Sequence, residues 1–138
     1  MRRVFVAILA TLFASVLFVP QAVAGSPHFV GQTSVVADGN TLTVSGKIAG
    51  LGNEEQVDVQ VTADARCINP GGNKPQAGNK QSFSAAGQFP VQNGKAEFSL
   101  TLTATFQPDC SPPMTVEWSN VVVTDTTHNI SQSFPGPF

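Results

Sequence analysis

The chain has 138 residues, a formal net charge of −2 and 12% charged residues. This weak acidity disfavours nucleic acid or an anionic membrane surface as a partner, because both require clustered lysine and arginine. The length fits one domain with its own core.

The first 24 residues have the three parts of an export signal. Arg2 and Arg3 form a positive start, residues 4–19 are apolar, and residues 22–24 (Ala-Val-Ala) offer a cleavage site between small residues. The apolar run is shorter than the roughly 20 residues of a membrane helix, and an uncleaved anchor is the alternative. We therefore predict a signal peptide over 1–24 and one secreted domain over 25–138, free of the membrane after cleavage.

The first three predicted strands follow the signal. Residues 29–37 precede the turn signal Asp38-Gly39-Asn40, and residues 41–48 alternate apolar and polar side chains, so a hairpin is expected. Residues 57–65 alternate valine and alanine with polar residues, which is typical of a strand with one buried face. Cys67 continues the buried register of this strand.

The next two predicted strands flank a second turn. Residues 82–91 are interrupted by Gly87 and Pro90, which favours an edge strand. Asn93-Gly94 predicts a hairpin turn that leads into residues 95–106, a long alternating strand.

The last two predicted strands are residues 115–124 and 130–134. The alternation of the first slips near Ser119-Asn120, which predicts a β-bulge, and it places Trp118 in the core rather than on a sugar-stacking surface. Seven short strands predict an all-β, two-sheet antiparallel sandwich of immunoglobulin-like topology.

Two cysteines, Cys67 and Cys110, predict one intrachain disulfide in an exported protein. Free thiols or a redox pair are the alternatives, but the Cys-x-x-Cys spacing of redox motifs is absent from the sequence. We expect the bridge to tie two loops near one end of the sandwich.

The segment 69–80 is the candidate binding loop. It is rich in glycine and proline, and it carries polar side chains that could recognise a ligand: Asn69, Asn73, Lys74, Asn79 and Lys80. The alternative is a solvated crossover connection between the two sheets.

This segment also carries a resemblance. The run Cys67-x-Asn69-x-Gly71-Gly72-Asn73-x-Pro75-x-Ala77-x-Asn79-Lys80 is similar to that of a family of small exported bacterial proteins of unknown activity, mostly from actinomycetes. The similarity extends to the runs Ser26-Pro27-His28-Phe29, Gly50-Leu51-Gly52-Asn53, residues 120–127 and Phe134-Pro135-Gly136. The resemblance implies secretion and a disulfide-linked β-domain, and it implies no catalytic residues.

Candidate chemistry is sparse in the sequence. His28 and His128 are the two histidines, and Asp125 lies three residues before His128, but no Gly-x-Ser-x-Gly motif accompanies this pair. Glu54, Glu55, Asp58 and Asp64 are interpreted as surface acids, with a weak calcium site left open. We predict no catalytic residue, no metal and no cofactor.

The sequence therefore favours a monomeric, non-catalytic extracellular domain. Its partner would be an unidentified extracellular protein or a cell-wall polymer. The alternatives are a small secreted hydrolase that uses Asp125 and His128, and an inhibitor of a secreted protease that presents the 69–79 loop.

Overall fold

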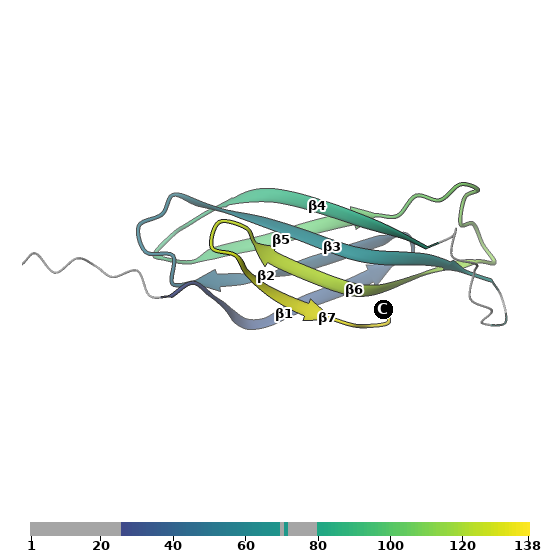
Figure 1. Ribbon diagram of the computed structural model, residues 1–138, viewed down its shortest axis with the longest axis horizontal. Coiled ribbons are helices and arrows are strands. Elements are labelled where there is room, and N and C mark those ends of the chain that lie inside the picture. Colours follow the sequence, from purple (N-terminus) through teal and green to yellow (C-terminus); the bar gives the residue numbers. More distant parts are fainter. Residues whose placement is uncertain (1–25, 70, 72–79) are drawn as a thin grey trace, which may run out of the picture.

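The computed structural model describes residues 26–69, 71 and 80–138, and there it contains seven β-strands and no helix (Figure 1). The strands are β1 (His28–Asp38), β2 (Thr41–Ala49), β3 (Gln56–Ile68), β4 (Lys80–Pro90), β5 (Ala96–Thr103), β6 (Thr115–Asp125) and β7 (Ile130–Phe134). The all-β prediction and its seven strands are confirmed. The predicted signal peptide, residues 1–24, lies outside the described residues.

The strands form two antiparallel sheets with the orders β1-β2-β5 and β4-β3-β6-β7. Figure 1 shows the sheets as two layers that run along the same long axis. β4 is an edge strand, as its glycine and proline predicted. β5 ends at Thr103, earlier than the predicted residue 106, because Thr103 pairs with Thr41 and β2 begins there.

The connection between β3 and β4 corrects one of our alternatives. β3 and β4 are neighbours in one sheet, and Arg66 pairs with Lys80 at the end of their ladder. The 69–79 segment therefore joins two paired strands and is not a crossover between sheets.

The Asn93-Gly94 turn forms as predicted, but the strands beside it separate. Gln92 and Lys95 exchange both backbone hydrogen bonds (2.8 and 3.0 Å), and Asn93 and Gly94 both have positive φ, as the tightest hairpin turns require. Beyond the turn, β4 pairs with β3 and β5 pairs with β2. The turn thus joins a strand of one sheet to a strand of the other, and the two strands beside it do not form a continuous hairpin.

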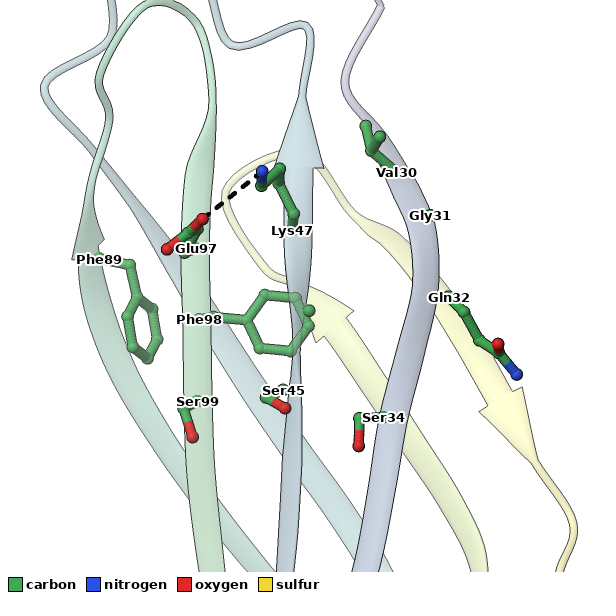
Figure 2. A pocket seen from close by; sticks show the side chains of 11 residues that line it. Val30, Gly31, Gln32, Ser34, Ser45, Lys47, Phe89, Glu97, Phe98 and Ser99 are labelled. Carbon is green, nitrogen blue, oxygen red and sulfur yellow. Dashed lines mark ion pairs between the residues drawn. The ribbon is translucent and has the colours of Figure 1, made fainter.

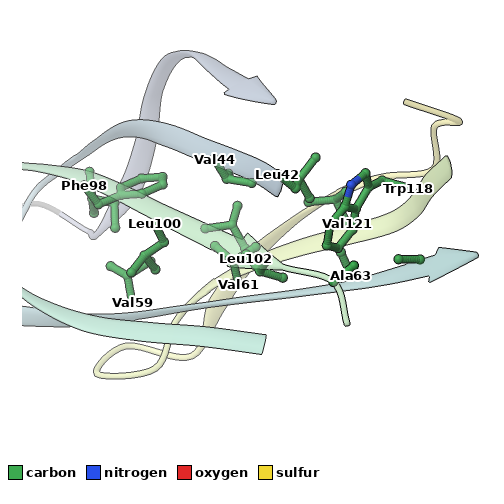
Figure 3. Close-up of a cluster of buried hydrophobic side chains, with 14 of the residues drawn as sticks. Leu42, Val44, Val59, Val61, Ala63, Phe98, Leu100, Leu102, Trp118 and Val121 are labelled. Atoms are coloured by element: carbon green, nitrogen blue, oxygen red, sulfur yellow. The ribbon is translucent and has the colours of Figure 1, made fainter. Parts of the chain in front are cut away.

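The core lies between the sheets and follows the period-two pattern of the strands (Figure 3). Leu42 and Leu102 from one sheet and Val61 and Val123 from the other are almost fully buried. Trp118 is also fully buried, as predicted, and its ring meets Phe83 edge-on with 5.9 Å between the centroids. Each such large apolar side chain contributes about 1.5–3 kcal/mol by leaving water.

The predicted bulge in β6 is present. Val122 pairs with Thr62 and Ser119 with Asp64, so that Asn120 and Val121 together stand opposite Ala63. Asn120 has a φ of 52°, in the left-handed region that asparagine tolerates better than most residues. The extra residue lets both Trp118 and Val121 point into the core.

Cys67 and Cys110 form the predicted disulfide, which joins residues 43 apart in the sequence. Cys67 lies near the end of β3 and is buried, and Cys110 lies in the connection between β5 and β6. The bridge thus fixes this connection to the end of the β3 strand, rather than tying two loops as expected.

Candidate functional site

The predicted binding loop is described only at its two ends. Asn69, just after β3, and Lys80, the first residue of β4, are both exposed and lie at the same end of the sheet. Asn73, Lys74 and Asn79 lie outside the described residues. The binding role of this segment stays a prediction.

A polar cluster on the outer face of β3, β4 and β6 lies next to Lys80. The Asp64 carboxylate accepts hydrogen bonds from Ser82 (2.6 Å) and from the Asn120 amide (3.0 Å), and the Lys80 ammonium is 3.8 Å away. The bonds from Asn120 and Ser82 lower the pKa of Asp64 and outweigh the opposing effect of burial, with further help from Lys80. The cluster ties three strands together.

A second cluster surrounds His128 in the turn between β6 and β7. Asp125, the last residue of β6, is fully buried, and its Oδ1 accepts the backbone N–H of His128 (3.1 Å). Its Oδ2 is 2.7 Å from His128 Nδ1, and Glu54 Oε1 is 2.8 Å from His128 Nε2. The imidazole therefore bridges two carboxylates.

This geometry bears on the hydrolase alternative. The expected contact between His128 and Asp125 is present, but Nε2, the nitrogen that would take a proton from a nucleophile, faces Glu54 instead. Among the described residues no hydroxyl group is hydrogen-bonded to this ring. The arrangement is suited to holding a proton between two acids.

The same contacts set the pKa of His128. Burial lowers it, but the hydrogen bonds to Asp125 and Glu54 and the negative charge of both outweigh burial, so the pKa lies above its ordinary value. Glu54 was missed by sequence reasoning as a partner, because it is 74 residues away in the chain and no local pattern links the two.

The outer face of the β1-β2-β5 sheet carries a depression of about 740 Å³, which also reaches the Phe98 ring and Phe89 of the neighbouring β4 (Figure 2). Figure 2 shows Ser99, Ser45 and Ser34 following one another across the three strands, with the Lys47–Glu97 ion pair (3.5 Å) farther along the face. Both of these charges belong to the same pair, so the lining is close to neutral.

The hydroxyl groups continue along the sheet beyond the depression. Thr43 pairs with Thr101 across β2 and β5, with 3.0 Å between the two hydroxyl oxygens, and Thr41 pairs with Thr103. The outer face of β2 and β5 thus presents successive cross-strand hydroxyl pairs, half-buried on β2 and exposed on β5. The ionic side chains of the Asp64 and Arg66–Glu117 clusters lie on the other sheet.

A bulge in β1 shapes the depression. Val30 pairs with Lys47 and Ser34 with Ser45, so that the three residues from Gly31 to Thr33 stand opposite Gly46 alone. Thr33 turns inward and donates a hydrogen bond to Gln132 Oε1 of β7 (2.7 Å). Alternation alone did not predict this bulge, although Gly31, with φ of 68°, was a local signal.

Residues 26–69, 71 and 80–138 hold no group of three or more His, Cys, Asp or Glu side chains placed to bind a metal ion. Over the same residues, no helix has the length and apolar character needed to cross a membrane.

Comparison of the chain with models of protein families, with curated proteins and with solved structures gives no match.

Proposed function

We propose that the protein is a secreted, non-catalytic binding domain whose ligand is a neutral, hydroxyl-rich polymer such as a glycan of the cell envelope. The observation that carries this proposal is the open depression on the β1-β2-β5 face, where serine hydroxyls from three adjacent strands lie beside the apolar side chains of Val30, Phe89 and Phe98. The Cys67–Cys110 bridge supports the secreted location, because disulfides persist in oxidising compartments.

The chemistry of this face fits an uncharged ligand. A serine or threonine hydroxyl both donates and accepts hydrogen bonds, as sugar hydroxyls do. Neighbouring strands are about 4.8 Å apart, so the hydroxyl rows of β2 and β5 form a regular array along which a chain can lie. The volume of about 740 Å³ is in the range of ligand sites, and the shallow opening suits a polymer better than a small molecule.

The topology supports an immunoglobulin-like sandwich as part of this proposal. If β1 to β7 correspond to the seven strands of a constant-type immunoglobulin domain, only the fourth strand changes sheets. The fold by itself implies no ligand. Membership in the family of small exported bacterial proteins is likewise a proposal that rests on the sequence motif.

Two other functions retain specific tests. A hydrolase would use the contact of His128 with Asp125, and the position of Glu54 at Nε2 argues against it. A protease inhibitor would present the 69–79 loop, and the mature protein would then block common secreted proteases when it is incubated with them. Replacing Asn69, Asn73, Lys74, Asn79 and Lys80 together by serine tests whether this segment binds any partner.

The test of the proposed function is co-sedimentation with insoluble polymers. The mature protein is mixed with a purified bacterial cell-wall fraction, with chitin and with cellulose, and the bound fraction is measured. The double variant Ser45→Arg, Ser99→Arg fills the depression. The matched control Thr62→Arg, Ser84→Arg alters a cross-strand pair on the outer face of the other sheet.

We expect the wild type and the control to sediment with at least one of the polymers, and the depression variant to lose at least tenfold in affinity, about 1.4 kcal/mol. Equal binding by the depression variant, or no binding by the wild type to any of the three polymers, would contradict the proposal.

A further inference from the structure

We infer that Asp125, His128 and Glu54 form a proton-dependent latch. In this latch a protonated His128 ties the turn between β2 and β3, which carries Glu54, to the turn between β6 and β7. Loss of one ring proton releases Glu54 and loosens the first of these turns. The inference concerns the conformation of the domain and is independent of the proposed ligand.

The number of N–H donors on the His128 ring depends on its protonation. A protonated imidazole has two N–H donors, and here each nitrogen has a carboxylate oxygen within 2.8 Å. A neutral ring has one N–H donor, so one of its nitrogens would present a lone pair to a carboxylate. The observed double contact is therefore complete only in the protonated state.

When the ring loses a proton, the contact of His128 with Glu54 breaks rather than the contact with Asp125. Asp125 is fully buried, and its carboxylate is also held by the backbone N–H of His128, so it cannot turn away without losing both bonds. The Glu54 side chain is 39% exposed and can rotate into water. The remaining proton therefore stays on Nδ1, and the contact between Nε2 and Glu54 is the one that opens.

Other hydrogen bonds still hold both turns after Glu54 separates from His128. Thr126 N–H still donates to the Asp58 carbonyl (2.9 Å), and Asp58 N–H donates to Thr127 Oγ1 (3.0 Å), so the β6–β7 turn stays attached to β3. The turn after β2 retains the bond from Leu51 N–H to the Gly94 carbonyl (2.9 Å). Leu51 is also fully buried, so the loosening should be local, around residues 52–55.

The charged groups around the His128 ring determine the pH at which the latch opens. The other titratable groups on the packed segments are Glu55, Asp58 and Lys95, and within the described chain the ion pairs of His128 are those with Asp125 and Glu54. Burial alone would lower the pKa of His128, but the two carboxylates outweigh it and hold the pKa above its ordinary value. The latch is therefore fully closed below about pH 6.5 and opens as the pH rises through the folded-state pKa.

The test combines ring titration with hydrogen exchange on the mature protein between about pH 6 and pH 9, a range that brackets the usual histidine transition. The nitrogen chemical shifts of His128 report its protonation. Amide exchange at residues 52–55, corrected for the intrinsic effect of pH, reports the turn. His128→Gln removes the titrating ring, Glu54→Gln removes one charge, and His28→Gln, at the other of the two histidines, is the matched control.

We expect His128 to titrate above about 6.5. As it does so, protection at residues 52–55 should fall by roughly up to tenfold for each unit by which the pKa is raised, while the strand amides stay protected. The change should persist in His28→Gln and vanish in His128→Gln. Glu54→Gln should lower the titration point of His128.

Two results would overturn the latch: a His128 that titrates at or below about 6.5, or turn exchange with the same pH dependence in His128→Gln as in the wild type. If His128→Gln does not fold, the ring titrations of the wild type and of Glu54→Gln decide the question alone.

Discussion

Gly46 shows how closely the inner surface of the depressed face is packed. It stands opposite Phe98 in the β2–β5 ladder, and a Cβ at this position would lie 2.8 Å from the Phe98 ring and 3.2 Å from Thr33 Oγ1. The Phe98 ring in turn meets Phe29 and Phe89 edge-on. A side chain at residue 46 would have to displace this aromatic group.

We expect Gly46→Ala to lower the free energy of unfolding by about 1–3 kcal/mol, as overpacking of a core does. Ser45→Ala, one residue away on the outer face, should stay within about 0.5 kcal/mol of the wild type. Chemical denaturation of both variants measures the difference. Equal stabilities of the two variants would show that the Phe98 ring moves aside freely.

Asp64 gives the domain a dependence on acid. Its pKa is lowered by the bonds from Asn120 and Ser82 and by Lys80, so its stabilising contribution is present above its ordinary pKa and is lost as the pH falls through the lower, folded-state pKa. We expect Asp64→Asn to flatten the fall of stability below about pH 4, and Ser82→Ala to flatten it in part. Urea unfolding between neutral and acid pH measures this, and an unchanged acid slope in Asp64→Asn would refute the assignment.

At the scale of elements, the disulfide is a covalent constraint that joins β3 to the connection between β5 and β6. It joins two cysteines that are 43 residues apart in the sequence. The loop that it closes contains the end of β3, all of β4 and β5, and part of the next connection. We expect Cys67→Ser to lower the free energy of unfolding by about 2–5 kcal/mol, because the unfolded chain gains freedom. Thermal and urea unfolding measure the loss.

Two controls accompany this disulfide prediction. Cys110→Ser should destabilise the protein by a similar amount, since either substitution opens the same bridge. Purified wild-type protein should show no reactive sulfhydryl without reductant. Two titratable thiols in the native protein would be incompatible with the bridge.

The elements themselves were largely predictable from the sequence. Strict alternation identified β3 and β5, and the slip at Ser119-Asn120 identified the β6 bulge, because the side-chain period of a strand is two. The sheet in which each strand pairs was harder to predict. The Asn93-Gly94 turn looks in sequence like the centre of a hairpin, yet the strands beside it go to different sheets.

The candidate sites were less predictable than the strands for a related reason. Glu54 meets His128, and Ser34 lines up with Ser45 and Ser99, only through pairings between strands distant in the chain. The position of Ser34 also depends on the β1 bulge, which moves the register between Val30 and Ser34. The residue types indicate which chemistry is possible, but which residues contact one another across the sheets can be known only from the folded structure.

At the scale of the whole molecule, the two outer faces differ in how many of the paired charged side chains they carry. The β4-β3-β6-β7 sheet carries the Arg66–Glu117 pair and the Asp64–Lys80 cluster, whereas the β1-β2-β5 sheet presents hydroxyl rows and the single Lys47–Glu97 pair. An exposed ion pair of this kind contributes little to stability and can rearrange around a ligand. This asymmetry makes the hydroxyl face the better candidate for an uncharged polymer.

The most direct measurement of this claim is amide chemical-shift mapping of the mature protein as solubilised cell-wall glycan fragments are added. We expect the largest shifts at residues 30–34, 45–47 and 97–101, with little change on the opposite sheet. Shifts confined to residues 69–80 would instead place recognition in the polar loop. The absence of any shift at saturating glycan would contradict the proposed function.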